Sequence, residues 1–169
     1  MKQGQCIFDL MGAHELTAEQ LEEMARHIVY EMRMWQWTYD ALARMDHEAP
    51  SNDSDQGWRN SLIESYLLHQ RALTEFFCPR NNPRAGDVFA TQYFPSWDAG
   101  SEGDELLASI PSLNKRVGHL TLSRIQNETR KVDESSWLQG HVPMMELLKR
   151  FEEMFGEKER RWFNPRLSA

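Results

Sequence analysis

Six polar side chains suited to phosphate chemistry recur at helical spacing in one segment of the sequence. They are Ser112, Lys115, Arg116, His119, Ser123 and Gln126. On a helix these residues share a face opposite Leu113, Val117 and Leu120. His119 could then act as a general acid or base on a phosphodiester, while Lys115 and Arg116 hold the phosphate. The pattern predicts a catalytic His119 and an RNA-binding group of Lys115, Arg116 and Arg124.

The same face also has a plainer interpretation, as the solvated side of an amphipathic helix that happens to include a histidine. The chain has 26 acidic and 19 basic residues, a formal net charge of −7. General affinity for nucleic acid comes from clustered Lys and Arg, so we expect no general DNA binding. RNA stays a candidate partner through this local patch only.

A second group of polar residues falls in an otherwise apolar segment. Asn60, Glu64 and Arg71 follow one line, and His69 lies deeper among apolar positions. Polar groups inside a protein need hydrogen-bond partners. We therefore predict a buried polar network of Asn60, Glu64, His69 and Arg71 that fixes helix register. The alternative is a small-ligand pocket near His69.

Several motifs that would indicate particular chemistries are missing from the sequence. We find no Glu-x-x-His, no His-Glu-x-x-His, no phosphate-binding Gly-rich loop, no Gly-x-Ser-x-Gly and no Cys-x-x-Cys. We therefore expect no metal and no cofactor, and leave enzymatic activity open. Cys6 and Cys78 are expected to be free thiols in a reducing cytosol.

Three segments, at residues 58–69, 86–89 and 113–121, resemble uncharacterised bacterial helical-bundle proteins. The arrangement over residues 17–155 also resembles the HEPN superfamily, helical bundles that include ribonucleases of toxin and phage-defence systems. The HEPN motif is an Arg, four to six residues, then a His, which would be His119 here. Positions 112–114, where the Arg would stand, are Ser, Leu and Asn, so the motif is not intact. The resemblance implies a homodimer with a non-catalytic, RNA- or nucleotide-associated role in bacterial stress or defence.

The helices that would position these residues can be read from capping and periodicity. Thr17 and Gln20 form a capping box, and a 4-3 apolar repeat then runs to about residue 45. This repeat, the inner seam, comprises Leu21, Ala25, Ile28, Met32, Trp35, Tyr39 and Leu42. Further helices are expected at about residues 58–77, 109–126 and from 143 onward, with a short one at 87–93.

These elements predict an all-α fold, a HEPN-like helical bundle of four long helices plus one short helix. We expect the bundle domain at residues 17–160, with tails at 1–16 and 161–169. Residues 1–11 lack the basic start and apolar run of a signal peptide, and no stretch approaches the length of a membrane span. The expected localisation is cytoplasmic. The alternative to an RNA-associated function is a protein–protein interaction module that uses the inner seam.

Overall fold

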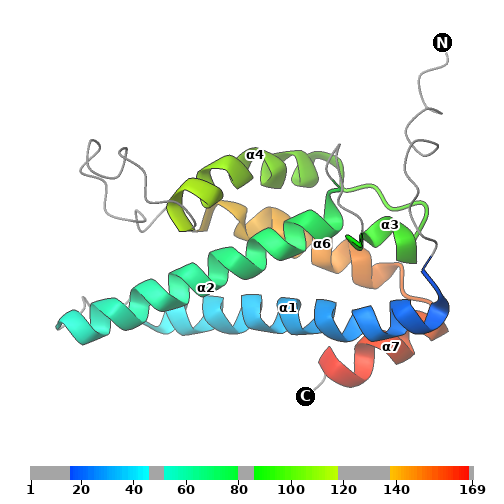
Figure 1. The fold of residues 1–169 in the computed structure, drawn as a ribbon, viewed down its shortest axis with the longest axis horizontal. Helices are drawn as coiled ribbons and strands as arrows, with labels where there is room; N and C mark the ends of the chain where they lie inside the picture. The colour runs from blue at the N-terminus through cyan, green and yellow to red at the C-terminus, as the bar shows by residue number, and fades with distance from the viewer. Residues whose placement is uncertain (1–15, 46–51, 80–85, 118–137, 168–169) are drawn as a thin grey trace, which may run out of the picture.

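The computed structural model describes residues 16–45, 52–79, 86–117 and 138–167, without the side chains of residues 111–117, 139 and 164–167. All regular secondary structure in these ranges is helical, so the predicted all-α class is confirmed. Two long helices, α1 and α2, lie side by side, with α4 and α6 on one side of them and α7 beneath α1 (Figure 1). None of the described helices is long and apolar enough to span a membrane.

Helix α1 (Ala18–Met45) begins and ends where the sequence predicts. The amide of Gln20 donates to Thr17 Oγ1 at 3.2 Å, and the amide of Thr17 donates to Gln20 Oε1 at 2.9 Å. This reciprocal capping box satisfies N–H groups that the first turn leaves unpaired. Ala25, Trp35 and Leu42 on the inner seam are fully buried. The inner seam is therefore the face through which α1 packs into its own fold.

Helix α2 (Asp53–Phe77) starts earlier than the predicted residue 58. The side chain of Asn52 accepts a hydrogen bond from the amide of Asp55 at 3.0 Å, which caps the helix. Asp53 and Asp55 in the first turn add negative charge at the positive end of the helix dipole. Residues 52–55 therefore form the cap and the first turn of this helix.

Helix α3 (Ala90–Tyr93) is a single short turn, and α4 (Gly100–Val117) follows a loop. The predicted start of this helix near residue 109 is wrong. The amide of Gly100 donates to Asp98 Oδ1 at 2.9 Å, and Gly100 has a positive φ of 58° that favours glycine. Pro111 lies well inside α4, and the predicted end near residue 126 is outside the described residues.

A 3-10 turn, η2 (Leu138–Gly140), leads into α6 (His141–Glu153), close to the predicted start. Helix α7 (Glu157–Leu167) replaces the tail predicted from residue 161. Trp162 and Phe163 are 7% and 0% exposed, because α7 lays them against α1 and the core. Two adjacent aromatic residues supply enough apolar surface to dock a helix that is otherwise highly charged.

The core is centred on Phe151 of α6, which is fully buried. Its ring makes edge-to-face contacts with Phe76, Trp97 and Phe163, with centroids 5.4, 5.6 and 5.5 Å away. The same core includes the buried residues Ile28, Met32, Leu62 and Leu73, and the partly buried Leu148 packs against it. Leu113, Val117 and Leu120, the apolar face predicted opposite the polar group of residues 112–126, lie outside the described side chains.

Candidate functional site

The predicted phosphate-binding face falls largely outside the part of the chain that the structure describes. His119 and Arg124 belong to residues 118–137, which are not described. Lys115 and Arg116 lie on the last turns of α4, but the positions of their side chains are not described either. The catalytic and RNA-binding assignments of these four residues stay predictions.

The predicted polar network divides between the interior and the surface. His69 is buried at 7% exposure, and its Nδ1 lies 2.6 Å from Glu31 Oε2, which ties α2 to α1. Asn60, Glu64 and Arg71 are only partly buried. The guanidinium of Arg71 donates to Glu75, one turn further along α2, at 3.0 Å. Of the four residues, only His69 is buried as the predicted network required. Glu64 and Arg71 have longer charged side chains that reach solvent.

A second histidine, which the sequence did not single out, lies in an aromatic cluster. The ring of His141 stacks on Tyr39 and Trp35, with centroids 3.7 and 4.8 Å away. Its Nδ1 lies 3.2 Å from the hydroxyl of Tyr66, whose pKa burial raises well above its usual value. Burial also lowers the pKa of His141, against a smaller opposing effect of Asp40. Burial therefore favours the neutral form of this imidazole, which joins α1, α2 and α6.

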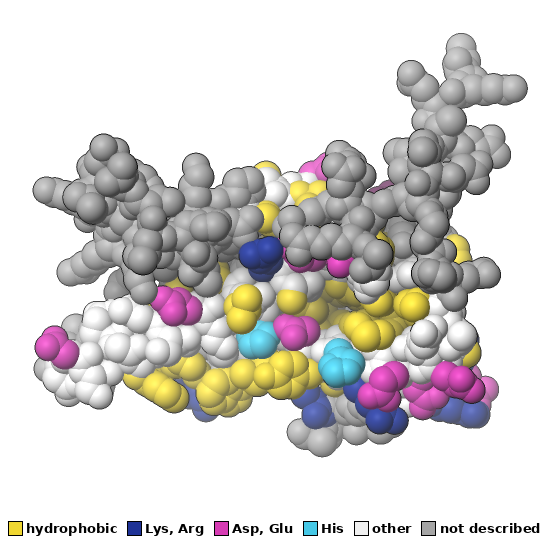
Figure 2. All heavy atoms as spheres, in the orientation of Figure 1, with side chains coloured by type: hydrophobic (Ala, Val, Ile, Leu, Met, Phe, Trp, Pro, Cys, Tyr) yellow, Lys and Arg dark blue, Asp and Glu magenta, His cyan; other side chains and the backbone are white. Residues whose placement is uncertain are grey.

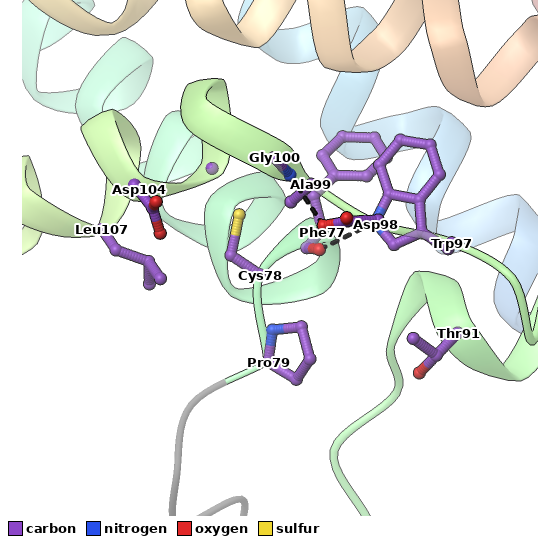
Figure 3. Close-up of a pocket in the computed structure, with 11 residues that line it drawn as sticks. Phe77, Cys78, Pro79, Thr91, Trp97, Asp98, Ala99, Gly100, Asp104 and Leu107 are labelled. Atoms are coloured by element: carbon purple, nitrogen blue, oxygen red, sulfur yellow. Dashed lines mark hydrogen bonds between the residues drawn. The ribbon is translucent and has the colours of Figure 1, made fainter. Parts of the chain in front are cut away.

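A half-open cavity of about 240 Å³ lies where the C-terminal end of α2 meets the first turns of α4 (Figure 3). One wall is fixed by the indole N–H of Trp97, which donates to the carbonyl of Phe77 at 2.9 Å. Cys78 is 3% exposed, and burial, with a smaller effect of Asp104, raises the pKa of its thiol to about 12. A thiol that stays protonated is a poor nucleophile and a poor metal ligand.

The cavity gives little support to the ligand-binding alternative, because His69 does not line it. His69 is instead occupied by Glu31. Among the residues whose positions are described, no three His, Cys, Asp or Glu side chains gather as they would around a metal ion.

The inner seam does not offer a docking surface, since Met32 and Trp35 are 5% and 0% exposed. The burial of these two residues gives no support to an interaction module that uses this seam, as predicted from the sequence. The opposite face of α1 is different. Tyr30 and Trp37, one heptad apart, are 54% and 50% exposed. A row of hydrophobic side chains follows α1 along its lower edge in Figure 2, with basic side chains beside it.

We name this face the outer seam and define it by seven residues at 3-4 spacing. They are Glu23, Arg26, Tyr30, Arg33, Trp37, Asp40 and Arg44, all exposed. They point away from the inner seam because each is offset by one or two residues from an inner-seam position. The charged members are held mainly within α1: Arg26 pairs with Glu23 at 3.1 Å, and Arg44 Nε donates to the carbonyl of Asp40 at 3.0 Å.

The apolar surface also continues onto α2. Tyr30 contacts the ring of His69 edge-on, with centroids 5.9 Å apart. Leu68, which precedes His69, is 55% exposed. Tyr30 and Trp37 on the outer seam, and Leu68 on α2, therefore each keep about half of their surface exposed. Scattered exposed apolar residues are ordinary, but neighbouring aromatic residues on one helix face are typical of an interaction surface.

Comparison of the chain with protein-family models, with curated proteins and with solved structures found no match. The resemblance to the HEPN superfamily stays a prediction from short sequence segments.

Proposed function

We propose that this domain is a protein–protein interaction module whose docking surface is the outer seam of α1. The observation that carries the proposal is the exposure of Tyr30 and Trp37 on a helix whose opposite face is fully used in the core. Aromatic residues and arginine are enriched in protein interfaces because they bury a large area and also form directed polar contacts. Tyr30, Arg33 and Trp37 provide this combination on adjacent turns of α1.

The outer seam is better supported than the other two candidate sites. Burial raises the pKa of the Cys78 thiol beside the cavity, which disfavours the reactive thiolate, and His69 is engaged by Glu31. The RNA hypothesis depends on side chains that are not described, and the net charge of −7 opposes it. Protein binding, by contrast, depends only on the outer seam, whose side chains are described.

Photo-crosslinking in cells that express the full chain tests the proposal. A benzoyl-phenylalanine replaces Trp37 on the outer seam, and in a matched control it replaces Glu105, which is exposed on α4. We expect protein adducts from position 37 and not from position 105. A Tyr30→Glu substitution in the same chain should remove them, because it places a charge in the centre of the surface.

Three results would overturn the proposal. The first is the same set of adducts from both positions, which would mean that the crosslinks are nonspecific. The second is the absence of protein adducts at position 37. An adduct with nucleic acid at position 37 would also contradict the proposal and would favour an RNA-binding role for α1.

A further inference from the structure

We infer that the partner of the outer seam is a second copy of this chain, packed antiparallel about a two-fold axis near Arg33. This inference rests on the proposed function, since it names the occupant of the same surface. It is carried by the order of residue types along the outer seam. That order is complementary to itself when one copy is reversed.

The outer pairs of this reversed arrangement join opposite charges. If residue 33 lies near the axis, Glu23 of one chain faces Arg44 of the second copy, and Arg26 faces Asp40. All four side chains are exposed in the single chain. Each pair occurs twice because the interface is two-fold, so four ion pairs bracket the contact.

The inner pair joins the two aromatic residues. Tyr30 of one chain meets Trp37 of the second copy on both sides of the axis, where both rings are half exposed in the single chain. Offset or edge-to-face pairing of such rings adds to the burial of their apolar area. The centre of the contact is thus apolar and its ends are charged, as in other protein interfaces.

A parallel arrangement lacks this complementarity. Each residue would then face its own copy, so Glu23 would meet Glu23, and Arg26 and Arg44 would each meet another arginine. Like charges that face one another across a helix pair are destabilising. The charges of the outer seam therefore favour the antiparallel arrangement and disfavour the parallel one.

Arg33 is the one unfavourable member, because the two copies of this residue approach each other near the axis. Each guanidinium can lie over the Trp37 ring of the second copy, which offsets part of the repulsion. The seam from Glu23 to Arg44 is about 32 Å long at 1.5 Å per residue. A single helix pair of this length buries an area near the low end for specific interfaces, about 1,200 Å² in total. We therefore expect a reversible dimer that forms in the micromolar range.

Sedimentation equilibrium on the full chain tests the inference through a charge swap. Glu23→Arg and Arg44→Glu should each weaken the dimer about threefold to tenfold, because each reverses two ion pairs. The double variant should recover the wild-type dissociation constant, since it restores opposite charges in the antiparallel arrangement. Glu105→Arg on α4 makes the same charge change away from the seam and should leave the dimer unchanged. Trp37→Glu should weaken it more than tenfold.

The outcomes separate this inference from the proposed function. A monomer at all concentrations up to about 500 µM would overturn the second copy as partner. Crosslinks from position 37 to a different protein would then leave the proposed function standing. A dimer that Trp37→Glu disrupts, but that the single charge variants and the double variant leave unchanged, would overturn the antiparallel arrangement. A tighter dimer in Arg33→Gln would support an axis near that residue, and a weaker one would contradict it.

Discussion

Two helical glycines, Gly57 in α2 and Gly103 in α4, have opposite surroundings. A Cβ atom added to Gly57 would meet nothing within 4 Å. At Gly103 it would overlap the Cβ of Ala99 and lie 3.0 Å from Cys78 Sγ. Glycine at position 103 therefore permits the close approach of α4 to the end of α2, where the cavity forms. At position 57 it only lowers helix stability.

We predict that Gly57→Ala and Gly103→Ala change stability in opposite directions. Gly57→Ala should stabilise the chain by about 0.5–1 kcal/mol, because alanine loses less backbone entropy in a helix. Gly103→Ala should destabilise it by about 1–3 kcal/mol, since the overlap with Ala99 and Cys78 exceeds that gain. Urea denaturation of both variants measures the two values. Equal changes at both sites would contradict the close packing at Gly103.

His141 leads to a prediction about pH. Burial lowers its pKa below the ordinary value of 6.5, so the unfolded chain takes up the proton first as the pH falls. The contribution of neutral His141 is fully present above about pH 6.5 and is lost as the pH falls through the folded-state pKa. We expect the free energy of unfolding to decrease from pH 7 to pH 5.

His141→Asn provides the comparison for this effect. The variant should be less stable at every pH, because it loses the stacking on Tyr39 and Trp35. Its stability should also change less between pH 7 and pH 5. Burial raises the pKa of Glu152, which acts in the opposite direction but equally in both proteins. Parallel stability–pH curves for the two proteins would show that His141 is not responsible.

Among the helices, α1 was predictable from its sequence, whereas the start of α2 was missed although Asn52 caps it locally, and the bounds of α4 and α7 were not predicted. α1 has a capping box and a long apolar repeat, so the predicted positions of both its ends were correct. α4 begins at a hydrogen bond between Gly100 and Asp98, about nine residues before the start predicted near residue 109. α7 is highly charged, and only the burial of Trp162 and Phe163 against α1 makes it part of the fold. Such tertiary packing leaves no pattern in the local sequence from which it could be predicted.

The contribution of α7 to stability can be measured through Phe163, which packs into the core and is fully buried. We predict that Phe163→Ala lowers the free energy of unfolding by about 3–5 kcal/mol, because it leaves a cavity beside Phe151 and Tyr93. The control is Trp58→Ala, at a residue that is 60% exposed and should change stability by less than about 0.5 kcal/mol. Similar values for both variants, measured by urea denaturation, would restore the view of residues 161–169 as a tail.

At the scale of the whole molecule, the candidate site was only partly predictable. The sequence indicated that α1 is the helix through which a second chain could bind, but it selected the inner seam. The outer seam was missed because its aromatic residues alternate with charged ones, which weakens any apolar repeat. The structure distinguishes the two faces by burial. This distinction depends on the packing of α1 against α2 and α7.

The outer seam and the C-terminal end of α4 are separate parts of the sequence, so protein binding and RNA binding can be tested independently. The RNA hypothesis predicts that Lys115→Glu/Arg116→Glu weakens binding of short single-stranded RNA and that Trp37→Glu does not. Binding should also fall steeply with salt, because each neutralised phosphate releases counterions. Cleavage should be slow or absent, since residues 112–114 provide no arginine for the HEPN motif.

A fluorescence titration at two salt concentrations measures binding. Equal binding by wild type and the double variant, or no binding by either, would remove RNA as a partner. Robust cleavage that His119→Ala abolishes would instead identify the chain as an enzyme.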